Sequence, residues 1–292
     1  MQLPLIVLSS VLVLTGADQS TNSVTISHCL VSLVEEAQVP AQEAGVLRSV
    51  EVREGQQVPN NGLLGRIDDQ RAQMQHKVAD FELKVAHERA ANDIEVRYAK
   101  AAASVAEAEH QQSVDANEKM PGTVPRAELR RLLLTHRRST LQIEQSELDK
   151  RVAALESLVR KAEKEAAGQN IALRQIRSPL EGVVVKVYRH SGEWVQPGDP
   201  VVHVVRIDRL RIEGFLNAAD YSPSEVAGRS VTVRVNLAHG RTESFPGKVV
   251  YVSPLVEAGG EFRIWADVLN REQNGHWLLR PGLTAEMTIH LK

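Results

Sequence analysis

The sequence predicts an α+β protein in which a long antiparallel α-helical (coiled-coil) hairpin interrupts a split β-module, and a small β-barrel follows. Three observations lead to this fold class. A glycine-punctuated strand motif occurs twice, in widely separated parts of the chain. Residues 69–118, which lie between the two copies, contain no proline or glycine and are rich in strong helix formers. Residues 205–292 alternate between apolar and polar side chains over short stretches, as strands do.

The N-terminus has the composition of an export signal. Residues 3–14 are apolar apart from two serines, and small residues follow at positions 15–17. A signal needs about 7–15 apolar residues, whereas a membrane-spanning helix needs roughly 20. We therefore expect residues 1–17 to direct export and the mature chain to begin near Asp18. Mass spectrometry of the native N-terminus tests this, and a retained Met1 in a cytoplasmic fraction would contradict it.

The two copies of the strand motif predict a pseudo-symmetric β-module. Residues 24–68 hold a leading strand and the first copy, and residues 176–204 hold the second. At a constant offset of 137 residues, identical residues recur at Gly45/Gly182, Val46/Val183, Val50/Val187, Gly55/Gly192 and Val58/Val195. Glycine is the residue that turns with positive φ require, so a repeat that keeps its glycines predicts two equivalent halves.

Residues 69–175 are predicted to form the helical hairpin, with its turn at 119–125. Apolar residues of the second helix recur in alternating steps of three and four, which is the heptad pattern of a coiled coil. We expect these residues to form the hairpin seam and to pack against the first helix: Leu141, Leu148, Val152, Leu155 and Val159. At roughly 1.5 Å per residue, each helix of about 50 residues would reach about 75 Å. Two helices of equal length joined by a tight turn return to their root, which brings the two β-halves together.

The first helix carries its apolar residues in two phases. Val78, Phe81 and Val85 follow one phase, and Ile94 to Ala108 follow another. A residue dropped from a heptad register in this way locally overwinds a coiled coil.

Residues 205–292 are predicted to form the β-barrel. Short alternating stretches recur in this region at a spacing that is typical of small antiparallel barrels. They comprise residues 210–216, 230–235, 245–252, 262–268 and 284–290.

This arrangement resembles the membrane fusion protein family, the HlyD-like periplasmic adaptor subunits. The resemblance covers residues 40–292. Its most telling segments are RSPLEGVV at 177–184, GEWVQPGDP at 192–200 and LLRPGLTAEM at 278–287. Each half of the split module looks like half of a lipoyl domain, so the module is expected to be lipoyl-like.

The resemblance implies a non-enzymatic adaptor of a tripartite efflux or secretion system. Such an adaptor couples an inner-membrane transporter to an outer-membrane channel and assembles as a homo-oligomeric ring, usually with six subunits. It is located in the periplasm, associated with the cell envelope or inner membrane. The alternative is a cell-envelope scaffold or spacer protein that uses the same hairpin with no transport role.

The hairpin tip is where we expect a partner to bind, because exposed loop residues remote from a core are free for recognition. The best-studied drug-efflux members start their second helix with Val/Ile-Ser-x-x-Glu. Here Pro125 takes the serine position, and the leucine and arginine positions of those members fall on Glu118 and Val114, so the resemblance does not identify the channel. The expected partner-binding residues are Pro121, Gly122, Val124, Pro125, Arg126, Glu128 and Leu129.

Other function classes find little support. A net charge of −2 and a pI near 6.6 give no basic field for nucleic acid. A lipoyl carrier needs a lysine on the hairpin between its halves, and residues 67–71 at that junction contain none. The histidines of the first helix, His76, His87 and His110, show no i, i+4 pair, and no nucleophile elbow or phosphate loop is present. We therefore expect no catalytic residues, no metal site and no cofactor.

Overall fold

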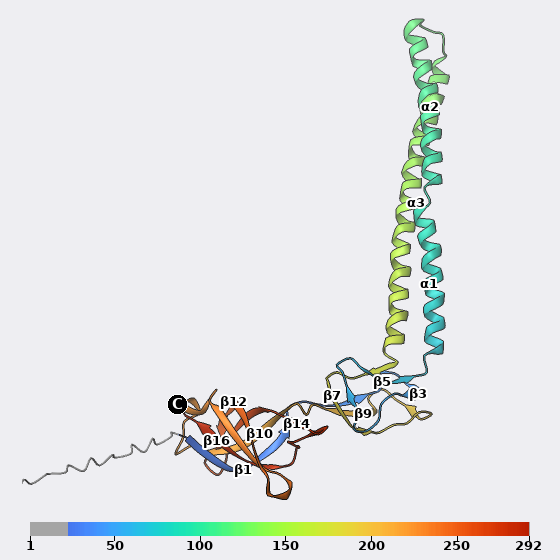
Figure 1. Ribbon diagram of the computed structural model, residues 1–292. Helices are drawn as coiled ribbons and strands as arrows, with labels where there is room; N and C mark the ends of the chain where they lie inside the picture. The colour runs from blue at the N-terminus through green and yellow to red at the C-terminus, as the bar shows by residue number, and fades with distance from the viewer. Residues whose placement is uncertain (1–22, 292) are drawn as a thin grey trace, which may run out of the picture.

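The computed structural model describes residues 23–291. A β-barrel and a β-module lie end to end, and a helical hairpin projects from the module, so that the molecule is L-shaped (Figure 1). The export signal predicted over residues 1–17 lies outside the described residues. Within residues 23–291, no helix combines the length and the apolar composition that crossing a membrane requires.

The barrel is a closed sheet of six strands in the order β1-β10-β13-β12-β11-β16. Its strands are β1 (Ser23–Leu33), β10 (Arg209–Asn217), β11 (Ser230–Asn236), β12 (Thr242–Val256), β13 (Glu261–Leu269) and β16 (Thr284–His290). Alternate residues of each strand point inward and are buried, including Phe245, Phe262 and Met287. This alternation is the one that the sequence shows over residues 205–292.

Strand β1 is where the structure differs from the expected division of the chain. We expected this leading strand to belong with the first half of the β-module, but it closes the barrel between β10 and β16. Without β1, the edges of β10 and β16 would expose unpaired backbone groups. The alternating pattern of residues 24–33 identifies a strand but does not identify the sheet to which the strand pairs, so the sequence left this choice open.

The β-module consists of two four-stranded sheets, ordered β2-β9-β7-β4 and β6-β5-β3-β8. Their strands are β2 (Glu36–Pro40), β3 (Gly45–Val50), β4 (Gln57–Val58), β5 (Leu63–Ile67), β6 (Gln175–Arg177), β7 (Gly182–Val187), β8 (Trp194–Val195) and β9 (Pro200–Val205). Each sheet contains strands from both sequence copies. Gly45 pairs with Val195, and Val58 pairs with Gly182. These two pairs exchange under the offset of 137 residues, so the repeat in the sequence is a true pseudo-symmetry of the fold.

The hairpin contains α1 (Gln70–Ala91), α2 (Ile94–Lys119) and α3 (Arg126–Ala172). The first arm is interrupted at Asn92, whose extended backbone (φ −69°, ψ 122°) ends α1. The Asn92 Oδ1 atom accepts a hydrogen bond of 3.0 Å from the Ile94 backbone N–H and so restarts the helix. The register change that the sequence shows in this arm is therefore accommodated by a break between two helices.

Short elements complete the barrel end. They are α4 (Pro223–Val226), a 3₁₀ turn (Ala238–Gly240), and the two-stranded ribbon of β14 (Glu272–Gln273) and β15 (His276–Trp277).

Candidate interaction surfaces

The hairpin tip is a compact turn held by the side chains of Asn117 and Thr123. Asn117, near the end of α2, donates from Nδ2 to the Val124 carbonyl and accepts at Oδ1 from the Val124 N–H, at 2.9 Å each. Thr123 Oγ1 donates to the Met120 carbonyl at 2.7 Å. Gly122 has φ +89°, a left-handed value that favours glycine. The turn is therefore defined by its own hydrogen bonds, although it lies far from the β-module (Figure 1).

All seven predicted tip residues lie together on this turn and on the first turn of α3. Pro121, Gly122, Pro125 and Arg126 are exposed, whereas the remaining three, Val124, Glu128 and Leu129, are half-buried. Arg131 Nε donates to Glu128 Oε2 at 2.9 Å, and this hydrogen bond holds the pKa of the Glu128 carboxyl below its usual range. The tip thus presents an ordered surface of mixed polar and apolar character.

Most of the buried side chains in the seam of the hairpin are small. On the first arm the buried residues are all alanines: Ala72, Ala86, Ala99, Ala103 and Ala106. On α3 the buried residues are Leu132 and Ser146. Alanine and serine allow the two arms to approach closely, so little apolar area is needed to keep them together.

Ion pairs between the arms support the register. Lys164 of α3 and Lys84 of α1 lie 2.6 and 2.8 Å from the Asp80 carboxylate, and both lower the pKa of Asp80 to about 2. Nearer the tip, Lys100 lies 2.9 Å from Glu147. Exposed pairs of this kind contribute little individually, but together they fix which residues face each other.

The predicted seam of α3 lies on the opposite side of the helix, and that prediction is wrong. Its five residues are between 51% and 63% exposed, and we call them the α3 stripe: Leu141, Leu148, Val152, Leu155 and Val159. The physical reason is that two long helices pack closely through small side chains, so the alanines of the first arm face α3. The bulkier apolar residues of α3 are left on its outer side. The alanines at steps of four and three, 99, 103 and 106, are the signal that identifies the true seam.

The first arm carries an equivalent outward stripe. Its residues are between 54% and 73% exposed, and we call them the α1–α2 stripe: Val78, Phe81, Val85, Ile94, Tyr98 and Val105. If the seam residues are assigned heptad positions a and d, both stripes fall at positions c and f. Positions c and f lie on the back of a helix whose a and d positions face its partner. The hairpin therefore has two different apolar backs, one on each arm.

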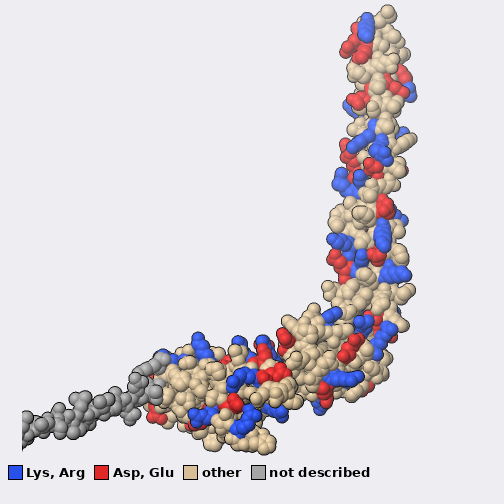
Figure 2. All heavy atoms as spheres, viewed as in Figure 1, with Lys and Arg blue, Asp and Glu red and all other residues tan. Residues whose placement is uncertain are grey.

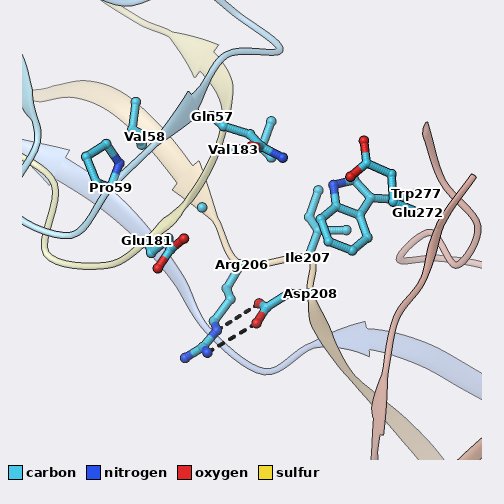
Figure 3. A pocket seen from close by; sticks show the side chains of 11 residues that line it. Gln57, Val58, Pro59, Glu181, Val183, Arg206, Ile207, Asp208, Glu272 and Trp277 are labelled. Carbon is cyan, nitrogen blue, oxygen red and sulfur yellow. Dashed lines mark hydrogen bonds and ion pairs between the residues drawn. The ribbon is translucent and has the colours of Figure 1, made fainter. Parts of the chain in front are cut away.

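A cleft of about 470 Å³ separates the β-module from the barrel (Figure 3). Gln57 and Val183 of the β-module line one side of the cleft. Trp277 of β15 lines the other side and faces Ile207 of the connecting segment. Arg206 spans this connection, donating from Nε to Asp208 at 2.8 Å and from Nη1 to Glu35 at 3.3 Å. These hydrogen bonds raise the pKa of Arg206 and lower that of Asp208. The hydrogen bond to Glu35 joins the two connecting segments between the β-module and the barrel.

No group of three or more histidine, cysteine or carboxylate side chains among residues 23–291 is placed to hold a metal ion.

Comparison with known proteins places the chain in a family. Residues 35–207, more than half of the chain, match the family described as RND MFP, barrel-sandwich hybrid domain. The chain therefore belongs to the membrane fusion protein family of efflux and secretion systems, as the sequence predicted. No curated protein matches the chain.

Solved structures of low sequence identity share the fold. MacA from Actinobacillus actinomycetemcomitans is 20% identical, with a TM-score of 0.63 over 92% of this chain and 78% of its own. The membrane fusion protein Spr0693 from Streptococcus pneumoniae R6 is 17% identical, with a TM-score of 0.52 over 92% of this chain and 99% of its own. A putative efflux transporter from Bacteroides eggerthii DSM 20697 is 15% identical, with a TM-score of 0.51 over 91% of this chain and 68% of its own.

Proposed function

We propose that this protein is a periplasmic adaptor that couples an inner-membrane transporter to an outer-membrane channel and acts as a ring of identical subunits. The observation that carries the proposal is the pair of apolar backs on the hairpin, which a single chain leaves exposed. Large exposed apolar surfaces mark sites of association. The export signal expected over residues 1–17 agrees with a periplasmic location.

The two stripes support self-association into a ring. Because the α3 stripe and the α1–α2 stripe are different surfaces on opposite sides of one hairpin, contact between copies is head-to-tail, and such contacts close into rings when the rotation permits. With 3.5 residues per turn, the directions of the a/d and c/f faces on one helix differ by about 154°, not 180°. If each helix contacts one neighbour through its a/d face and the other through its c/f face, the helices form a closed polygon with this interior angle. Such a polygon holds roughly twelve to fourteen helices. Six hairpins, with two helical arms each, provide twelve helices.

The tip supports the role of partner contact. In a ring of parallel hairpins, the tips of all subunits gather at the end remote from the β-modules and barrels. The tip residues are ordered by Asn117 and have no role in a β-core. A channel that docks there would extend the tube, and a transporter would engage the ring at the barrel end.

We expect the double variant Leu129→Asp with Arg126→Glu to abolish transport and to leave expression and ring assembly intact. The changes reverse one charge and place another on the tip, which would disrupt docking without touching either stripe. Cargo export by cells that carry only the variant is the measurement. Arg137→Glu, the same charge change farther along α3, is the matched control and should export normally.

Cross-linking complements this test. A photoreactive group at position 126 should capture an outer-membrane channel. Normal export by the double variant would remove the tip from the docking site. Unchanged export in cells that lack the protein altogether would favour the scaffold or spacer role.

A further inference from the structure

The hairpin has two flanks, between the seam and the apolar backs, and they differ in charge. One flank is formed by heptad position g of each helix, and the other by positions e and b. Because the arms are antiparallel, equivalent positions lie on the same side. Glu82, Arg89 and Glu156, all at position g, line one groove between α1 and α3. His87 and Lys161, at position e, line the groove on the other side.

The g flank is acidic. Over the helical residues 70–117 and 129–172, below the tip, it carries six carboxylates and one arginine: Glu82, Arg89, Glu95, Glu109, Asp149, Glu156 and Glu163. All seven residues are exposed in the single chain. Arg160, at a seam position, reaches this flank and lies 3.3 Å from Glu82 and 2.8 Å from Glu163. The other four carboxylates are spread along the flank, so the negative charge is not confined to one level.

The opposite flank has a surplus of basic residues. Over the same residues below the tip, positions e and b carry eight lysines and arginines against five carboxylates: Lys77, Asp80, Lys84, Arg97, Lys100, Glu107, Arg130, Arg137, Glu144, Glu147, Arg151, Lys161 and Glu165. The visible face of the hairpin shows both signs along its length (Figure 2). Negative and positive side chains are therefore separated around the hairpin, by heptad position, and not along its length.

The geometry of the stripes decides which flank faces inward. Going round the helix axis from the a/d face to the c/f face, the angle is about 154° on the side that carries position g. On the side that carries positions e and b it is about 206°. In a closed ring the smaller angle at each helix faces the centre. Position g therefore points into the tube, and positions e and b point outward.

We propose that the acidic g flank lines the bore of the assembled tube and favours cationic over anionic cargo. The inference rests on the proposed ring and adds the class of cargo. Each carboxylate is repeated once per subunit, so the bore contains successive rings of negative charge. Rings of Asp and Glu side chains select cations in other pores, and a narrow acidic channel raises the local concentration of cations.

Engineered cysteines test both the orientation and the charge. Gln142, at position g, and Thr140, at position e, are exposed neighbours on α3, and each would be replaced by cysteine in a separate variant. The native Cys29 does not interfere, because it is fully buried and burial raises its thiol pKa to about 11. The probes are a trimethylammonium and a sulfonate methanethiosulfonate of similar size, together with a bulky polyethylene-glycol maleimide.

In the assembled ring, the bulky maleimide should label Thr140→Cys and spare Gln142→Cys. The cationic reagent should modify Gln142→Cys about tenfold or more faster than the anionic reagent, and Thr140→Cys should show little preference. Replacing the neighbouring acids, Glu109→Gln with Asp149→Asn, should reduce the preference at position 142.

Three results would count against these ideas, and they are distinguishable. Bulky labelling at position 142 with protection at position 140, in an intact ring, overturns the assignment of the flanks. Equal rates for the two small reagents at position 142 overturn the charge selection. A chain that sedimentation velocity and cross-linking show to be monomeric contradicts the ring and with it the proposed function.

Discussion

Leu155→Asp is expected to dissociate the proposed ring and to leave the hairpin folded. Leu155 is 62% exposed in the single chain and lies in the α3 stripe, so a carboxylate there stays in water when the chain is alone. In the ring the same carboxylate would be buried against an apolar back of the neighbouring subunit, at a cost of several kcal/mol in each interface. Sedimentation velocity should show the shift from ring to monomer, with helical circular dichroism unchanged.

Two control variants define this result. Ala154→Asp places the same charge at the adjacent exposed position e, outside both stripes, and should keep the ring. Ala103→Asp places it in the seam, where Ala103 is 6% exposed, and should lower the free energy of unfolding of the hairpin by about 3–5 kcal/mol. If Leu155→Asp instead unfolded the hairpin and Ala103→Asp did not, the assignment of seam and back would be reversed.

Gly182→Ala is expected to destabilise the β-module by about 3 kcal/mol. A Cβ atom at this position would clash with the Val205 carbonyl oxygen and would lie 2.8 Å from the carbonyl carbon. Both atoms belong to the backbone of β9, so the clash cannot be relieved by rotating a side chain. Relief would require β9 to move, and β9 leads directly into Arg206 at the barrel connection. Calorimetric melting of the intact protein measures the effect.

Gly168→Ala is the matched control for this change. Gly168 lies inside α3, and an added Cβ would make only ordinary contact with His76, at 3.7 Å. Alanine is favoured over glycine in a helix interior by roughly 0.5–1 kcal/mol, so this variant should be slightly more stable than the parent. A Gly182→Ala protein that melts like the parent would show that β7 and β9 are farther apart than the structure places them.

The modular order of the chain could be predicted from its sequence because the signals are local. Helix formers without proline or glycine, alternating strands and repeated turn glycines each depend on residues close together in the chain. The resemblance to membrane fusion proteins added the family, and with it the expected ring and partners. The structure confirms this fold, and the family match confirms the family.

Partners distant in sequence were decided only by the tertiary structure. Strand β1 completes a barrel whose other strands lie near the C-terminus, and nothing in residues 24–33 distinguishes that sheet from the adjacent β-module. The seam of the hairpin is the second case. Periodicity located one apolar stripe on α3, including Leu148 and Leu155, and this stripe was expected to face the other arm. The seam is instead lined by small side chains such as Ala103 and Ser146, because close packing of two long helices requires little bulk, while the bulky stripe remains on the outer surface.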